Sequence, residues 1–207
     1  MGKSHSQIFG KRAIDIIVAA SGIAISSLLI LAISIMIFIE SGLPIIIHQR
    51  VGRGGRFFNC LKFRTMVQNQ EQVLQDYLAK NPDAAKEWNE THKLKNDPRI
   101  TKVGRLLRKT SLDELPQLFN VLKGDMSIVG PRPIVAQEAE KYGSNFLHYA
   151  SVKPGITGLW QVSGRNDLSY EKRVEIDSYY ARNWSIIGDI AIMLKTIPAV
   201  LLQKGAY

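Results

Sequence analysis

The chain has 207 residues, a net charge of +9 and an apolar share of 45%, which together favour one folded domain over a disordered chain. Its single cysteine, Cys60, excludes an intrachain disulfide and argues against a cysteine-based zinc site. Residues 1–64 carry eight Lys and Arg against Asp15 and Glu40, a net +6, whereas 65–207 carry only +3. The basic excess flanks an apolar segment, and no nucleic-acid reader motif occurs. We therefore expect a membrane, and no nucleic acid, as partner.

The first predicted element is a membrane helix. Residues 16–39 contain no charged side chain. A helix of this length rises roughly 36 Å, which exceeds the bilayer core of about 30 Å. A buried core helix is the alternative, and a signal peptide is disfavoured because no small-residue cleavage site follows. The sequence therefore predicts a membrane-inserted segment over 1–42.

The flanks of this segment bear on its topology. Lys11 and Arg12 precede it and further basic residues follow it, so the positive-inside bias would keep both flanks cytoplasmic. A re-entrant helix that bends and returns satisfies this bias, and the hydroxyls around Ser27 suit a bend. Asp15 is expected to pair with Lys11 or Arg12 at the interface. The residues alone leave a re-entrant and a spanning helix both open.

Shorter elements follow in chain order. A β-hairpin is predicted around the glycine turn 52–55, and a helical region over 67–95 is interrupted at 81–83. A helix is expected over 111–123, a modest helix over 134–149 and helical structure over 170–202, with a glycine-rich loop over 151–167 between the last two. These elements indicate an α+β chain that is mostly helical, with the cytoplasmic unit over 43–207.

The predicted helix over 111–123 holds the strongest candidate for chemistry. Ser111 and Glu114 fit a capping box, and Asp113 could merely complement the helix dipole. The functional alternative is that one carboxylate holds a divalent cation while the other attacks an electrophile beside it. Such an electrophile could be a phosphoryl group, because Arg108 and Arg132 supply cations nearby.

Two further stretches suit phosphate or sugar binding. Arg132 lies between two prolines, which either present its guanidinium to a phosphate or form only a rigid turn. The glycine-rich stretch 154–166 contains Gln161, Arg165 and Asn166 as hydrogen-bond donors. No P-loop sequence occurs in the chain.

Several short segments of the sequence, together with their order along the chain, resemble those of the bacterial monotopic phosphoglycosyl transferases. The resemblance covers almost the whole chain. The string Leu-Asp-Glu-Leu-Pro-Gln at 112–117 is the most specific of them. The matching segments are Lys11–Asp15, His48–Gly52, Lys62–Met66, Thr110–Ser127, Gly130–Pro133 and Lys153–Asn166.

The resemblance implies an activity. Such enzymes transfer a sugar 1-phosphate from a UDP-sugar to undecaprenyl phosphate at the cytoplasmic face of the inner membrane. The reaction releases UMP, uses Mg²⁺ and starts polysaccharide or glycoconjugate synthesis. By this resemblance Asp113 is the nucleophile, which forms an aspartyl phosphosugar, and Glu114 is its partner at the metal or the general base. The other implied contacts are phosphate binding by Arg108, a donor pocket lined by Arg132, Gln161, Arg165 and Asn166, and positions near the membrane face and the phosphates for Lys62 and Arg64.

Within that family the chain is most similar to the catalytic part of the enzymes that transfer galactose 1-phosphate to undecaprenyl phosphate. Galactose or glucose is therefore the expected hexose. Those relatives often carry further N-terminal membrane helices, and we expect this chain to be a short form or a truncation. The family breaks its membrane helix at a Ser-Pro pair, where this chain reads Ser27-Leu28. We still favour a re-entrant helix-break-helix, with interfacial amphipathic helices around a cytoplasmic catalytic site. A homodimer is a further expectation, and a non-catalytic membrane scaffold that binds anionic lipid or a partner enzyme is the alternative function.

Overall fold

The computed structural model describes residues 4–92, 94–164 and 168–201. The first element, α1 (His5–Ser41), begins at Ser4, whose hydroxyl accepts a hydrogen bond from the Gln7 amide. It ends at Gly42, which has a φ of 82°. Of the elements described, α1 is the one helix that is long and apolar enough to cross a membrane.

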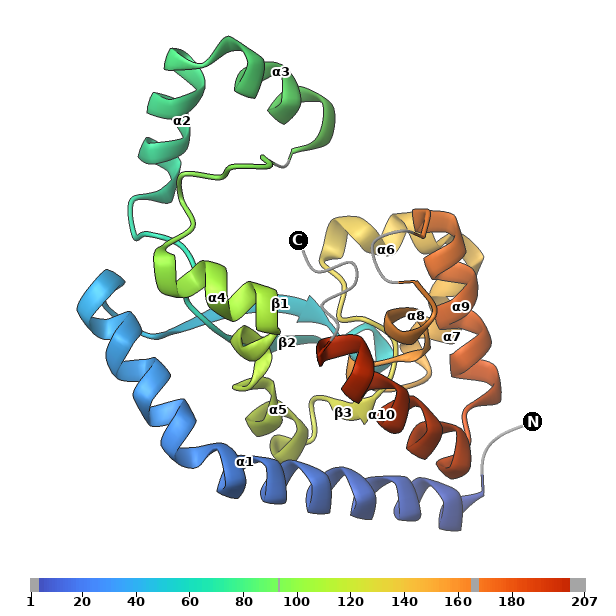
Figure 1. Cartoon of the computed structure of the whole chain (residues 1–207). Helices are drawn as coiled ribbons and strands as arrows, with labels where there is room; N and C mark the ends of the chain where they lie inside the picture. The colour runs from blue at the N-terminus through green and yellow to red at the C-terminus, as the bar shows by residue number, and fades with distance from the viewer. Residues whose placement is uncertain (1–3, 93, 165–167, 202–207) are drawn as a thin grey trace.

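Helix α1 bends in its middle without losing its helical assignment, as Figure 1 shows in blue. The Ser26 hydroxyl donates to the Gly22 carbonyl at 2.6 Å, and the Ser27 hydroxyl donates to the Ala24 carbonyl at 2.9 Å. Such bonds from serine to the preceding turn bend helices, so the bend does not need the absent proline. The bend agrees with the sequence, whereas the orientation of α1 in a membrane stays a prediction.

The outer surface of α1 is apolar. Ile25, Leu28 and Ile39 are each about 80% exposed, and few apolar side chains of this helix are buried. Soluble monomers rarely expose contiguous apolar patches larger than a few hundred Å². This surface therefore fits a membrane-associated helix.

A β-hairpin follows, as the sequence predicts. Strands β1 (Ile45–Val51) and β2 (Phe57–Phe63) pair antiparallel and are joined by the turn η1 (Arg53–Gly55). The outer edge of β2 is covered by the side chain of Asn120, which accepts from the Leu61 amide at 2.9 Å and donates to the Asn59 carbonyl at 2.7 Å. The amide side chain thus replaces a third strand and fixes the hairpin on the helical body.

The region 67–95 is helical and broken at Asn81, as predicted. Helices α2 (Gln70–Lys80) and α3 (Pro82–Thr91) form a helical hairpin that projects from the rest of the molecule in Figure 1. The chain returns beside its own start, because the Val67 amide donates to the Arg99 carbonyl at 2.9 Å.

The helix expected over 111–123 is divided, which corrects the sequence prediction. The elements are α4 (Lys102–Thr110), the 3₁₀ turn η2 (Leu112–Glu114) and α5 (Gln117–Lys123). Ser111 adopts a left-handed conformation with φ 57° and ends α4, and its side chain forms no capping bond. The predicted capping box with Glu114 is therefore wrong, because Ser111 terminates one helix instead of starting the next. Gly124 ends α5 with φ 96°, as predicted.

The C-terminal half surrounds a small parallel pair of strands, β3 (Ser127–Val129) and β4 (Gly155–Thr157). Gly158 lies so close to Gly130 that a Cβ there would overlap the Gly130 carbonyl oxygen. The glycine-rich region is thus partly ordered into β4 and α8, rather than only a loop. The remaining elements are α6 (Ala136–Tyr142), η3 (Gly143–Asn145), α7 (Phe146–Ala150), α8 (Leu159–Val162), α9 (Tyr170–Asn183) and α10 (Ile186–Leu201).

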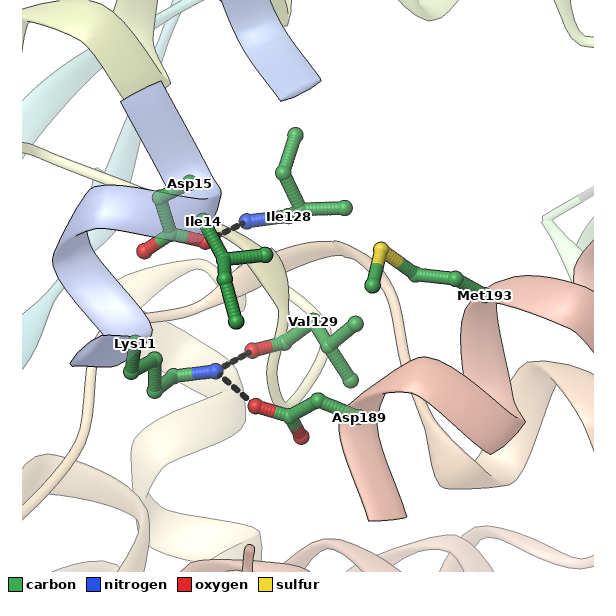
Figure 2. Close-up of a pocket in the computed structure, with 7 residues that line it drawn as sticks. All are labelled: Lys11, Ile14, Asp15, Ile128, Val129, Asp189 and Met193. Atoms are coloured by element: carbon green, nitrogen blue, oxygen red, sulfur yellow. Dashed lines mark hydrogen bonds and ion pairs between the residues drawn. The ribbon is translucent and has the colours of Figure 1, made fainter. Parts of the chain in front are cut away.

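Charged residues at the start of α1 fasten this helix to the body. The Lys11 ammonium is 2.5 Å from an Asp189 carboxylate oxygen of α10 and donates to the Val129 carbonyl at 2.9 Å (Figure 2). Asp15 accepts from the Ser127 hydroxyl and the Ile128 amide. The predicted pairing of Asp15 with Lys11 or Arg12 is therefore wrong. Both the acid and Lys11 bind groups from distant parts of the chain instead of each other.

Arg12 has a separate role at the same end of α1. Its guanidinium donates to the Val121 and Leu122 carbonyls, at 2.6 and 2.8 Å. These carbonyls lie in the last turn of α5, where the negative end of the helix dipole attracts a cation. The basic pair before the apolar segment thus binds protein groups.

Candidate active site

Two adjacent carboxylates converge on one ammonium group. Asp113 is only 3% exposed, and its carboxylate lies 2.8 Å from the Lys62 ammonium. The Glu114 carboxylate lies 3.6 Å from the same ammonium and is more open to solvent. Turn η2 supplies both acids, whereas Lys62 comes from β2. The structure therefore brings together three of the residues that the sequence singles out.

Arg108 completes this group from the last turn of α4. Burial lowers the pKa of its guanidinium, and the negative charge of Asp113 acts in the opposite direction. The Arg108 Nε donates to the hydroxyl of Thr65 at 2.9 Å. Thr65 is 3% exposed, so the hydroxyl holds the guanidinium in a fixed position.

Thr65 is a residue that sequence reasoning missed. Its carbonyl accepts from the Thr101 amide at 3.1 Å, and a Cβ at Gly104 would overlap this carbonyl. Helix α4 therefore packs directly against the chain that follows β2, and this contact sets the position of Arg108. The only sequence signal was the position of Thr65 inside the segment Lys62–Met66.

Arg64 lies apart from the acids. Its Nε donates to the Leu43 carbonyl at 2.8 Å, in the link between α1 and β1. Within the described residues it forms no ion pair with Asp113 or Glu114. The structure places Arg64 near the end of the apolar helix rather than among the acids.

Arg132 and Gln161 lie together around Trp160. The Arg132 guanidinium is 5.7 Å from the centre of the Trp160 ring. Arg132 Nε, Trp160 Nε1 and Gln161 Oε1 are buried without a hydrogen-bond partner in the part of the chain that is described. Buried polar groups are usually satisfied, so this cluster is suited to a polar ligand or bound water. Arg165 and Asn166 lie outside the described residues.

Helix α9 adds two charged residues that the sequence did not single out. The Arg173 guanidinium also faces Trp160, at 5.6 Å from the ring centre, and pairs with Glu138 at 2.9 Å. Asp177 is fully buried and accepts from the Tyr142 hydroxyl at 2.9 Å. Burial raises the pKa of Asp177 to about 7, against the opposing effect of that hydrogen bond.

One face of the hairpin connects the two clusters. Lys62 lies opposite Ile46, and strand alternation places His48 and Arg50 on the same face as both. The pKa of His48 is lowered by burial first and then by Arg50 and Lys62. The pKa of Arg50 is lowered by burial first and then by Arg132. A row of basic groups therefore runs from the two acids toward Arg132.

The two acids fit a magnesium site in their chemistry. No group of three or more His, Cys, Asp or Glu converges on a metal position in the described ranges. Mg²⁺, however, is commonly held by one or two carboxylates together with substrate phosphates and water. Asp113 and Glu114 supply two carboxylates that already share one cation.

Comparison with known proteins identifies the family of this chain. The sequence model of the family described as bacterial sugar transferase matches residues 6–203. The UDP-galactose-lipid carrier transferase of Erwinia amylovora is 56% identical over 206 residues, which is 98% of this chain and 43% of that protein. The undecaprenyl-phosphate galactose phosphotransferase of Salmonella typhimurium is 54% identical over 203 residues, covering 98% of this chain and 43% of that protein.

A shorter relative is matched over most of its length. The exopolysaccharide production protein ExoY of Sinorhizobium fredii is 50% identical over 198 residues, which is 95% of this chain and 88% of that protein. The chain thus spans less than half of the two longer relatives and most of the shorter one. On the match of the family model and on these identities, the chain belongs to the bacterial sugar transferase family.

Proposed function

We propose that the protein transfers a hexose 1-phosphate from a UDP-hexose to undecaprenyl phosphate and releases UMP. The observation that carries this proposal is the convergence of Asp113 and Glu114 on Lys62, with Arg108 near enough for the charge of Asp113 to act on it. A buried acid among cations suits attack on a phosphorus that carries negative charge. The names of the relatives favour galactose as the hexose.

The proposed reaction has two displacements at one phosphorus atom. A carboxylate oxygen of Asp113 attacks the phosphorus that bears the sugar, and the bond from this phosphorus to the UMP oxygen breaks. The resulting acyl phosphate is then attacked by a phosphate oxygen of undecaprenyl phosphate, and the bond to Asp113 breaks. Lys62 and Arg108 orient the phosphoryl oxygens and offset their charge. Bound Mg²⁺ would add further charge stabilisation, and Asp113 and Glu114 would hold it.

The apolar surface of α1 supports a location at the membrane, where the polyprenyl acceptor resides. We place α1 as a re-entrant helix in the cytoplasmic leaflet of the bacterial inner membrane, with the acids on the cytoplasmic side. The bend of α1 and its exposed apolar side chains support this topology. UDP-sugars are then available from the same side as the acids.

Purified protein in detergent or nanodiscs, given UDP-galactose, undecaprenyl phosphate and Mg²⁺, should release UMP. Excess EDTA should abolish this release, and added Mg²⁺ should restore it, because Asp113 and Glu114 offset the charges of Lys62 and Arg108 and leave the diphosphate charge unbalanced. Absence of UMP release under all these conditions would support the alternative of a non-catalytic scaffold. Full activity in EDTA would contradict the magnesium assignment.

Replacing Thr65 tests how Arg108 is positioned. Thr65→Val removes the hydroxyl and keeps the shape, and it should lower kcat/KM for UDP-galactose about 10- to 100-fold, because hydrogen bonds to charged groups contribute about 1.5–3 kcal/mol. Thr65→Ser keeps the hydroxyl and should retain most activity. Steady-state kinetics checks both variants, and equal activity of Thr65→Val and wild type would rule out this role.

A further inference from the structure

Arg50 is a half-buried arginine in β1 that has no ion-pair partner among the residues that the structure describes. Within the described residues its guanidinium forms no hydrogen bond or ion pair. Burying an unpaired charge is costly, so an arginine in this state usually has a ligand or a partner. The hairpin also has exposed arginines, Arg53 and Arg56, which solvent can hydrate.

A second arginine lies beside it. The Val51 amide donates to the Ile134 carbonyl at 2.9 Å, which fixes the end of β1 against the loop that carries Arg132. Arg132 is the largest influence on Arg50 after burial, and its effect is repulsive. Arg132 forms no ion pair in the described part of the chain, and its Nε is buried without a partner.

Nearby acids are engaged elsewhere. The Glu138 carboxylate pairs with Arg173 at 2.9 Å and accepts from the Val135 amide. The fully buried Asp177 has a pKa raised to about 7, so it supplies only a partial charge at neutral pH. Three arginines thus face two acids, and the excess charge is positive.

We propose that Arg50 and Arg132 together bind the phosphate of the departing nucleotide, which is the phosphate that UMP retains. This proposal rests on the proposed function. The sugar-bearing phosphorus must lie at Asp113, between Lys62 and Arg108. A donor that extends from there along the hairpin face brings its neighbouring phosphate toward Arg50, which lies on the same face as Lys62. Two guanidinium groups can bind the oxygens of one phosphate through paired hydrogen bonds.

This pair of arginines, Arg50 and Arg132, is called the clamp below, and it makes a distinctive prediction for Arg50→Gln. UMP affinity, measured by calorimetry, should fall at least about tenfold, whereas the weaker affinity for uridine should not change. Arg50→Lys should bind UMP with intermediate affinity, because lysine keeps the charge but loses the planar fork. Arg56→Gln, an exposed arginine of the same hairpin, is the matched control and should bind UMP within about twofold of wild type.

Thermal unfolding separates binding from a structural role. Without ligand, Arg50→Gln should melt at or above the wild-type temperature, because the substitution removes repulsion between two guanidinium groups. Pyrophosphate should raise the melting temperature of wild type and of Arg56→Gln, but not of Arg50→Gln. A loss of several degrees in ligand-free Arg50→Gln would identify Arg50 as structural and overturn the proposal.

Unchanged UMP affinity in Arg50→Gln, or an equal loss for uridine, would also overturn it. The clamp and the proposed function can fail separately. If wild type releases no UMP from UDP-galactose, yet pyrophosphate stabilises it only when Arg50 is present, the clamp stands and the proposed reaction does not.

Discussion

Asp113→Asn should reduce sugar phosphate transfer by at least about 1000-fold, because removal of a covalent nucleophile removes the pathway itself. Asparagine has nearly the same shape as aspartate, and Lys62 keeps the Glu114 carboxylate at 3.6 Å as a partner, so the fold should persist. UMP release from UDP-galactose in the presence of undecaprenyl phosphate measures the effect. Wild-type turnover from this variant would eliminate Asp113 as nucleophile.

Asp125→Asn is the matched control for this variant. Asp125 lies two residues after the end of α5. Its carboxylate pairs at 3.3 Å with Lys123, whose side chain is 69% exposed, and accepts from the Asn120 side-chain amide at 3.5 Å. An ion pair with so exposed a lysine contributes little, so Asp125→Asn should keep most of the activity. An equal loss in both variants would show that the assay reports a general effect of removing acids near α5.

Lys11→Met should lower the free energy of unfolding by about 3–5 kcal/mol, because it leaves Asp189 as a buried charge without its cation. In a chain of this size that corresponds to a fall in melting temperature on the order of 10 °C. The side chains of Lys11 and Asp189 are 15% and 6% exposed, and the Tyr180 hydroxyl donates to the same carboxylate. Thermal unfolding in detergent measures the change.

The pH dependence of this variant follows from Asp189. Burial raises the pKa of its carboxyl, whereas Lys11 lowers it, so removing Lys11 favours the protonated acid further. A folded-state pKa above the unfolded value means that the folded state binds more protons. The loss in Lys11→Met should therefore shrink as the pH falls.

Two further variants test whether burial is the cause. Lys11→Met combined with Asp189→Asn should recover much of the loss, because no unpaired charge remains. Lys172→Met is the matched control, since Lys172 and Glu175 form a 2.8 Å pair whose side chains are 59% and 64% exposed. It should change stability by less than about 1 kcal/mol. A small effect of Lys11→Met, equal to that of Lys172→Met, would contradict the anchoring role.

The sequence correctly predicted those elements whose conformation is determined by residues close together in the chain. The hairpin follows from alternation and a glycine turn, and Gly124 ends α5 because a left-handed residue is needed there. They failed at Ser111, whose left-handed conformation makes it the end of α4. A serine before two acidic residues is typical of a helix N-cap. No neighbouring residue indicates that Ser111 instead ends the preceding helix.

Long-range pairing accounts for most of what was missed. Lys11 and Asp189 are 178 positions apart, so the sequence suggested a nearby partner for each charge at the start of α1. The candidate acids stood out by their place at a predicted helix start, and the resemblance of their string to a known family favoured a catalytic role over helix capping. Arg50 and Thr65 lie inside strings that also match, but their roles depend on Arg132 and Arg108, which the fold brings from distant segments.

The central claim is that Asp113 carries the sugar phosphate between the two substrates. Intact-mass spectrometry of protein incubated with UDP-galactose and Mg²⁺, without polyprenyl acceptor, tests it directly. Wild type should gain the mass of one hexose phosphate, peptide mapping should place it on Asp113, and added undecaprenyl phosphate should remove it. An unmodified wild-type protein that still completes the transfer would contradict the claim, as would an adduct that also forms on Asp113→Asn.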